Sequence, residues 1–168
     1  MLRTPKRPDL LVEIARKAPH LQFVVCGGLT SHRSPGNTAA QAANVLKQLP
    51  NVNYRGRVEP EEASRIIENA ALLLSTSDQE GFPNTFVQAW SHGTPVVTLR
   101  VDPDNVIKQY NLGCITGTVD ATVGRVQELL SRTEERQTMA IKARQYILEQ
   151  HSAEVVVKRF DDATRHCI

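Results

Sequence analysis

The sequence is poor in aromatic residues and has no long apolar run, and each shortage excludes a class of protein. Phe, Trp and Tyr make up 5% of the residues, so the aromatic platforms that stack against single-stranded nucleic acids are scarce. No apolar segment approaches the roughly 18 residues that a membrane-spanning helix needs. The first residues also lack the apolar core of a signal peptide. We therefore expect no nucleic-acid partner and no membrane span.

Cysteines are few, and the net charge is small. Cys26, Cys114 and Cys167 are widely spaced and form no Cys-x-x-Cys pair, so neither a zinc site nor a disulfide framework is expected. Reduced thiols in a cytoplasmic protein are the simplest interpretation. The formal charge of +2 does not indicate a nucleic-acid surface. Contact with the cytoplasmic face of a membrane remains an alternative that the mixed charge pattern does not support.

What the sequence does contain is an alternation of short apolar runs and helical patterns. Its 168 residues suffice for one domain, 1–168, with its own core. Apolar runs that end at turn residues predict strands, and apolar residues at three- and four-residue spacing predict helices. Strands are predicted at 21–26, 52–54, 72–74, 95–99 and 114–116, helices at 8–18, 38–49, 59–69, 85–91 and 106–110, and a loop at 29–37.

This order predicts an α/β fold with a Rossmann-like parallel sheet sandwiched by helices. The segment 119–168 is predicted to be all-helical, with helices at 119–131, 134–150 and 153–166. Residues 1–6 leave little room for a strand before the first helix. Either the sheet begins at Phe23, or the chain lacks the first strand of such a fold.

Three predicted strand ends carry glycine or polar residues. Gly27-Gly28, Gly56-Arg57 and the segment 75–84 each follow a strand, and ligands of parallel α/β folds bind at that edge. The last segment ends where a helix begins, and free amides at a helix start favour anions. Glu80 in this loop is suited to accept hydrogen bonds from ligand hydroxyls. The pattern therefore predicts one cleft for a phosphorylated, polyhydroxylated ligand.

Several segments in order carry a resemblance to a known family. They are Lys6–Leu11 (KRPDLL), Phe23–Gly28 (FVVCGG), Val52–Val58 (VNYRGRV), Glu80–Asn84 (EGFPN) and Gly93–Val97 (GTPVV). Together they resemble the C-terminal, nucleotide-sugar-binding domain of GT-B glycosyltransferases, closest to the retaining family-4 or group 1 enzymes. The resemblance covers nearly the whole chain.

The resemblance implies a hexosyltransferase-like activity. A sugar would pass from a nucleoside diphosphate sugar to an acceptor, a saccharide or a lipid, with retained configuration and with no metal or other cofactor. The acceptor would be bound by a separate N-terminal Rossmann domain, for which this chain has no room. This domain alone is therefore expected to bind the donor without transferring sugar efficiently.

The resemblance also assigns residues. Glu80 would hold donor-sugar hydroxyls and Lys6 would stabilise charge on the leaving diphosphate, as electrostatic catalysis requires. The backbone of Arg57 and Val58 would lie against the base. The full set of expected donor-binding positions is Gly27, Gly28, Arg57, Val58, Gly81, Phe82, Pro83, Asn84, Thr85 and Gln88.

Two positions depart from the family pattern. Gln88 stands where a second glutamate holds the ribose hydroxyls, and an amide lacks the charge-assisted grip of a carboxylate. We expect weaker nucleotide binding from this change. The arginine that partners the family's lysine would fall at Met1, and Arg3 lies near but out of register.

Simpler interpretations stand beside these assignments. Glu80 could cap the next helix, Gly27-Gly28 could be only a tight turn, and Lys6 and Arg57 could be solvated. Asp102-Pro103-Asp104 resembles a metal-binding Asp-x-Asp motif, but Pro103 favours an ordinary turn and no metal site is predicted.

Two other functions remain open from the sequence. One is a non-catalytic nucleotide-sugar-binding or interaction module, which Gln88 favours. The other is a domain like a sugar-nucleotide epimerase, which would need further acid and base groups in the cleft besides Glu80.

Overall fold

The computed structural model describes residues 4–28 and 38–165, and all five strands within them run parallel to their neighbours. They are β1 (Phe23–Cys26), β2 (Val52–Gly56), β3 (Leu73–Ser75), β4 (Val96–Thr98) and β5 (Gly113–Ile115). The predicted parallel α/β architecture is confirmed. The strands pair as two sheets, β1-β2 and β3-β4-β5, where the sequence predicted one sheet. The predicted loop 29–37, the end of the last helix and Met1, Arg3 and Cys167 lie outside the described residues.

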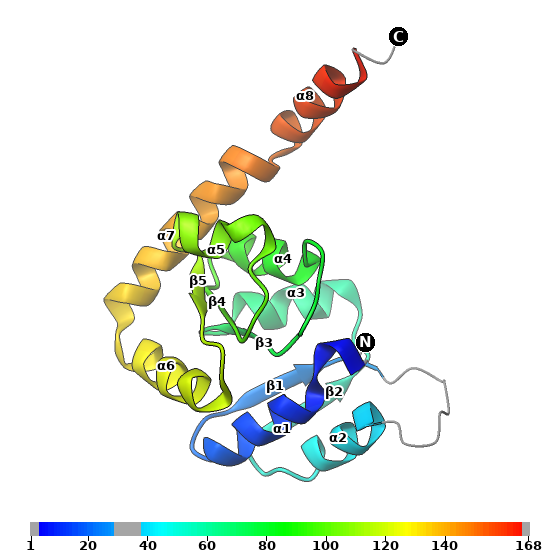
Figure 1. Cartoon of the computed structure of the whole chain (residues 1–168), viewed down its shortest axis with the longest axis vertical. Helices are drawn as coiled ribbons and strands as arrows, with labels where there is room; N and C mark the ends of the chain where they lie inside the picture. Colours follow the sequence, from blue (N-terminus) through cyan, green and yellow to red (C-terminus); the bar gives the residue numbers. More distant parts are fainter. Residues whose placement is uncertain (1–3, 29–37, 166–168) are drawn as a thin grey trace.

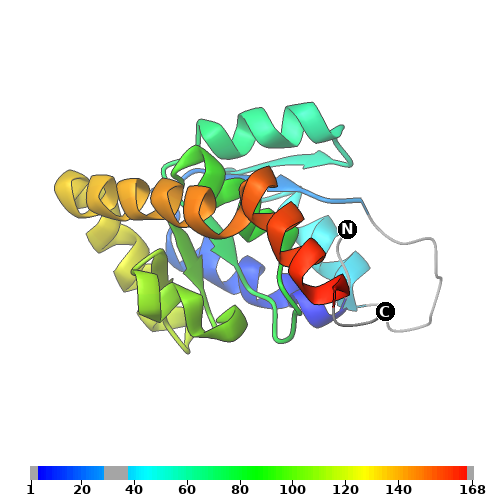
Figure 2. The same ribbon diagram turned by 90° about the horizontal axis from the view of Figure 1, so that it is seen from above.

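Helices cover the strands on both sides (Figures 1 and 2). The helices are η1 (Thr4–Lys6), α1 (Pro8–Lys17), α2 (Thr38–Leu46), α3 (Pro60–Glu68), α4 (Asn84–His92), η2 (Pro103–Asn105), α5 (Val106–Tyr110), α6 (Val119–Ser131), α7 (Thr133–His151) and α8 (Ala153–Thr164). Helix α1 packs with α2 and α6, whereas α4 packs with α3 and α7. The predicted helices are all present, with ends that differ by a few residues.

Helix α4, which begins beside the predicted cleft, is fixed by aromatic packing. Its Phe86 and Trp90 are fully buried, and the Trp90 ring meets that of Tyr146 on α7 edge-on at 5.5 Å. The indole N–H of Trp90 also donates to the Leu112 carbonyl at 3.1 Å, so its one polar atom is satisfied inside the core. Burial of this apolar side fixes the direction in which the start of α4 points.

The turn after α4 sets where β4 begins. Gly93 has a φ of 73°, a left-handed conformation that glycine adopts without steric cost. Its amide donates to Trp90, and the amide of Thr94 donates to Ala89 at 2.7 Å. The chain therefore turns directly into the buried strand β4, as the Gly-Thr-Pro segment predicts.

Helix α7 runs alongside α4 and α5, and α8 continues beyond them towards the C-terminus (Figure 1). Tyr146, Ala143 and Met139 of α7 are buried, but no residue of α8 is buried. Val157 and Phe160 are 59% and 67% exposed. In the part of the chain that the structure describes, no helix combines the length and the apolar character that crossing a bilayer requires.

Candidate functional site

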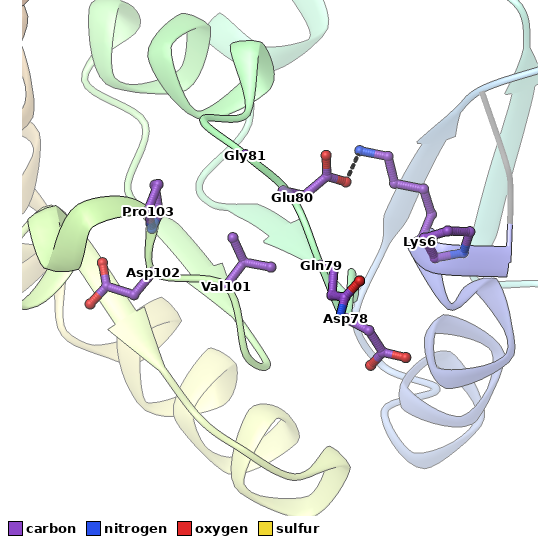
Figure 3. Close-up of a pocket in the computed structure, with 9 residues that line it drawn as sticks. Lys6, Asp78, Gln79, Glu80, Gly81, Val101, Asp102 and Pro103 are labelled. Atoms are coloured by element: carbon purple, nitrogen blue, oxygen red, sulfur yellow. Dashed lines mark ion pairs between the residues drawn. The ribbon is translucent and has the colours of Figure 1, made fainter.

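A pocket of about 750 Å³ opens beyond the ends of β3 and β4 (Figure 3). This is the edge at which parallel α/β folds bind ligands, and its size is typical of small-molecule sites. Its walls come from the chain start, from the loop between β3 and α4, and from the segment after β4. The lining residues are Pro5, Lys6, Asp78, Gln79, Glu80, Gly81, Val101, Asp102 and Pro103.

Lys6 and Glu80, the two predicted catalytic residues, form an ion pair at this pocket (Figure 3). Lys6 ends η1, and Glu80 lies in the loop between β3 and α4. Their side chains are 33% and 20% exposed, so both charges reach the pocket while partly shielded from water. A cation suited to phosphate and a carboxylate suited to hydroxyls therefore lie within reach of one bound molecule.

The start of α4 lies next to Glu80 in the chain. Pro83 precedes the helix, and its carbonyl accepts from the Phe86 amide at 2.9 Å. In the described part of the chain, no side chain caps this end. Asn84 and Thr85, the first helical residues, are exposed. Amides of a first helical turn have no carbonyl partner within the helix, so this end favours an anion.

Phe82 anchors the loop that carries Glu80. Its ring meets Trp90 edge-on at 6.2 Å and lies 5.3 Å from the His151 ring, where α7 ends. Gly81, by contrast, is exposed, and a Cβ there would meet nothing within 4 Å. The loop is therefore held on its Phe82 side by the core and is open on the pocket side.

The other predicted positions form a second group at the ends of β1 and β2. The Gly27 amide donates to Gly56 at 2.6 Å, and the Tyr54 hydroxyl donates to the Gly27 carbonyl at 2.8 Å. A Cβ on Gly28 would lie 3.4 Å from that of Arg57. Gly27, Gly28, Arg57 and Val58 are not among the residues that line the pocket.

Gln88, the position of the altered motif, is exposed on α4, four residues after Asn84. It does not line the pocket either. Of the predicted residues, the structure thus brings Lys6, Glu80 and Gly81 together at the pocket, whereas Phe82, Pro83, Asn84, Thr85 and Gln88 are not among its lining residues.

The sequence motifs did not predict that the segment after β4 forms a wall of the pocket. Asp102 and Pro103 line the pocket, and one carboxylate oxygen of Asp102 accepts from the Ile107 amide at 2.8 Å. Asp104 and Asn105 have φ values of 51° and 60°, so the chain turns sharply here, as the Asp-Pro-Asp sequence predicts. The available signal was the position of this turn at a predicted strand end. Among the described residues, no group of three or more His, Cys, Asp or Glu side chains could hold a metal.

Charged side chains around Asp78, one of the lining residues, form a further cluster. The Arg7 guanidinium donates to both Asp9 oxygens, and to Asp78 at 3.0 Å. The hydrogen bonds to Asp9 and then to Asp78 raise the pKa of Arg7 above its ordinary range. The hydrogen bond from Arg7 lowers the pKa of Asp9. Asp78 also pairs with Arg100, so these four residues join three segments of the chain.

Comparison with known proteins places these observations in a family. Residues 3–132 match the family model described as glycosyl transferases group 1. No curated protein matches the chain.

Solved structures show the same fold. Sucrose-phosphate synthase from Thermosynechococcus elongatus has a TM-score of 0.83 at 18% identity, over 98% of this chain and 43% of that one. HepE from Anabaena, solved with UDP-glucose, has a TM-score of 0.82 at 15% identity, over 97% of this chain and 46% of that one. A variant of S. aureus TarM, solved with UDP, alpha-GlcNAc-glycerol and fondaparinux, has a TM-score of 0.75 at 21% identity, over 94% of this chain and 32% of that one. The chain thus spans less than half the length of each.

Proposed function

The chain belongs to the group 1 glycosyl transferases, and we propose that it binds the sugar donor, a nucleoside diphosphate sugar, for a retaining transfer. The observation that carries this proposal is the Lys6–Glu80 pair at the pocket beyond β3 and β4. One group suits the diphosphate and the other the sugar hydroxyls. The open start of α4 supplies further donors for the phosphates.

The proposed chemistry uses charge stabilisation. During transfer the bond between the sugar and the diphosphate breaks and its electron pair goes to the diphosphate oxygen. The acceptor hydroxyl oxygen forms the new bond on the same face of the sugar, and its proton passes to the leaving diphosphate. Lys6 and the amides of Asn84 and Thr85 would stabilise the negative charge that builds on the diphosphate. Preoriented donors of this kind contribute strongly to such reactions. Glu80 would keep the sugar in place through its hydroxyls.

Uridine diphosphate sugars are the first ligands to test. Neighbouring folds from S. aureus and Anabaena were solved with UDP or UDP-glucose, which supports this class. We extend the proposal to the acceptor, a saccharide or lipid held by a second domain of a longer enzyme. On that proposal, this chain alone binds donor and transfers little or no sugar.

Calorimetry with UDP and UDP-glucose tests the roles of Lys6 and Glu80. Glu80→Ala should weaken UDP-glucose about tenfold or more, because a charge-assisted hydrogen bond contributes roughly 1.5–3 kcal/mol. It should leave UDP affinity unchanged or improved, since Lys6 loses its internal partner. Lys6→Gln should weaken both ligands alike.

Glu68→Ala, an exposed glutamate at the end of α3, is the matched control and should match the wild type. Equal losses of both ligands in Glu80→Ala would contradict the sugar-hydroxyl role. If the wild-type protein binds no nucleoside diphosphate or diphospho-sugar at millimolar concentration, the donor-binding proposal is wrong.

Gln88 motivates a second candidate, a non-catalytic module that binds nucleotide sugars. If Gln88 occupies the ribose-binding position, Gln88→Glu should strengthen UDP binding about fivefold and leave pyrophosphate binding unchanged. Sugar transfer by the longer protein would reject the non-catalytic candidate. The epimerase-like alternative would be supported by conversion of UDP-glucose to its 2-epimer.

A further inference from the structure

Two segments that lie far apart in the sequence are hydrogen-bonded to each other at the wall of the pocket. The Asp78 amide donates to the Pro5 carbonyl at 2.9 Å, and the Thr76 hydroxyl donates to the Lys6 carbonyl at 2.7 Å. Thr76 and Ser77 are 8% and 2% exposed. The chain start that carries Lys6 is therefore attached to the loop that carries Glu80.

The Asp78 carboxylate adds a second connection on the same side. One of its oxygens accepts from Arg7 at 3.0 Å, and the other pairs with Arg100, just after β4. Each oxygen therefore has its own arginine, from two different walls of the pocket. In Figure 3 the Asp78 carboxylate points away from Glu80, and its two oxygens meet Arg7 and Arg100.

Arg7 has a backbone conformation that needs support. Its φ of 45° is in the left-handed region, which is uncommon for residues other than glycine and persists where surrounding contacts hold it. Arg7 directly follows Lys6 and directly precedes α1. The backbone conformation of Arg7 therefore sets the direction of Lys6 relative to α1. The contact with Asp78 holds the Arg7 guanidinium in place.

These contacts contribute more to orientation than to stability. The side chains of Arg7, Asp78 and Arg100 are 28%, 31% and 50% exposed, and ion pairs this accessible to water contribute little net folding stability. Their geometric effect is larger, because Lys6 is one residue from Arg7 and Glu80 is two residues from Asp78. Site geometry matters at about the 1 Å level.

We propose that Asp78 is a positioning residue: through Arg7 and the backbone of Pro5–Lys6 it holds the Lys6 ammonium at the pocket, opposite Glu80. The inference rests on the proposed donor-binding function and extends it to a residue outside the matched motifs. Asp78 lines the pocket, but both of its carboxylate oxygens are bound by arginines, so on this proposal its effect on the diphosphate passes through Lys6.

The first test is independent of any ligand. Reductive ¹³C-methylation keeps lysines charged and gives each an NMR signal, and Lys6→Gln identifies that of Lys6. Asp78→Asn, which keeps the backbone and one acceptor oxygen, should move the Lys6 signal. Asp9→Asn removes the other carboxylate partner of Arg7 and should move it much less. An unmoved Lys6 signal in Asp78→Asn would overturn the proposal.

The second test uses UDP affinity in a double-mutant cycle. Asp78→Asn should weaken UDP about tenfold, whereas Asp9→Asn should stay within twofold of the wild type, with unchanged thermal unfolding in both. In a Lys6→Gln background, Asp78→Asn should cause no further loss. Additive losses would show that Asp78 does not act through Lys6. If the wild type binds no UDP, the proposed function fails, while the Lys6 signal still decides the positioning of Lys6.

Discussion

Asn51 shows how one buried side chain secures the end of a helix. It is 4% exposed, and its amide group lies 2.9 Å and 3.0 Å from the carbonyl oxygens of Ala15 and Ala18 and 3.2 Å from that of Leu21. Carbonyls at a helix end lack partners within the helix. Asn51, which precedes β2, therefore donates hydrogen bonds to these carbonyls from another segment and fixes α1 against the sheet.

We expect Asn51→Ala to lower the free energy of unfolding by about 1–3 kcal/mol, the cost of leaving buried polar groups unsatisfied. Urea titration followed by circular dichroism would measure it. Asn53→Ala is the control, because Asn53 is exposed two residues further along and should change stability by less than about 0.5 kcal/mol. Similar losses in the two variants would contradict this role of the Asn51 amide.

His151 is the residue whose titration links stability to pH. It lies against Phe82 and Tyr146, and burial, followed by the nearby charge of Arg159, lowers its pKa from the ordinary 6.5. The unfolded chain thus binds the proton more readily than the folded protein does. The contribution of neutral His151 to stability is therefore present above pH 6.5. It is lost as the pH falls from 6.5 towards the lowered pKa of His151 in the folded state.

Stability measured between pH 7.5 and 5 should therefore fall more steeply in the wild type than in His151→Phe, which keeps an aromatic ring and removes the titrating group. Chemical denaturation at each pH would measure the difference. Identical pH profiles for the two proteins would show that His151 does not couple to folding.

At the scale of elements, glycine has a different cause at Gly93 and at Gly113. A Cβ on Gly93 would lie 2.4 Å from the guanidinium carbon of Arg144 on α7, and Arg144 donates to the His92 carbonyl at 2.6 Å. Because that guanidinium is the end of a flexible side chain, the left-handed φ of Gly93, 73°, is the main reason for glycine here. A Cβ on Gly113, at the start of β5, would lie 1.8 Å from the carbonyl oxygen of Val96 on β4, so glycine is required where these strands meet.

Gly113→Ala should destabilise the protein by at least about 2 kcal/mol, because overpacking here displaces backbone. Gly124→Ala in α6 is the matched control, since its added Cβ meets nothing within 4 Å. Alanine in a helix interior should stabilise by roughly 0.5–1 kcal/mol. Thermal unfolding of both variants would test the contrast, and a tolerated Gly113→Ala would mean that β4 and β5 can separate without cost.

At the scale of the whole molecule, the pocket joins distant parts of the chain. Its walls come from the chain start, from the β3–α4 loop and from the segment after β4, so a ligand there contacts segments that must all be folded. A molecule that binds only the folded state stabilises it by mass action.

UDP-glucose at about 100 times its Kd should add roughly 2.7 kcal/mol of stability, which corresponds to a rise of about 5–10 °C in Tm for a protein of this size. Scanning calorimetry would measure the shift. At the same ligand concentration, Glu80→Ala should show about half that rise, because tenfold weaker binding reduces the added stability to roughly 1.4 kcal/mol. A full rise in that variant would place the ligand elsewhere.

The sequence by itself determined the elements and the motif-bearing loops. Apolar spacing depends on near neighbours, so the helices and strands, the turn at Gly93 and the polar segment before α4 were predictable. Tertiary structure alone decided which walls meet. Arg7 and Asp78 are 71 residues apart and Asp78 and Arg100 are 22 apart. Their contacts depend on which strand ends lie side by side, a long-range property of sheet pairing that no local pattern encodes.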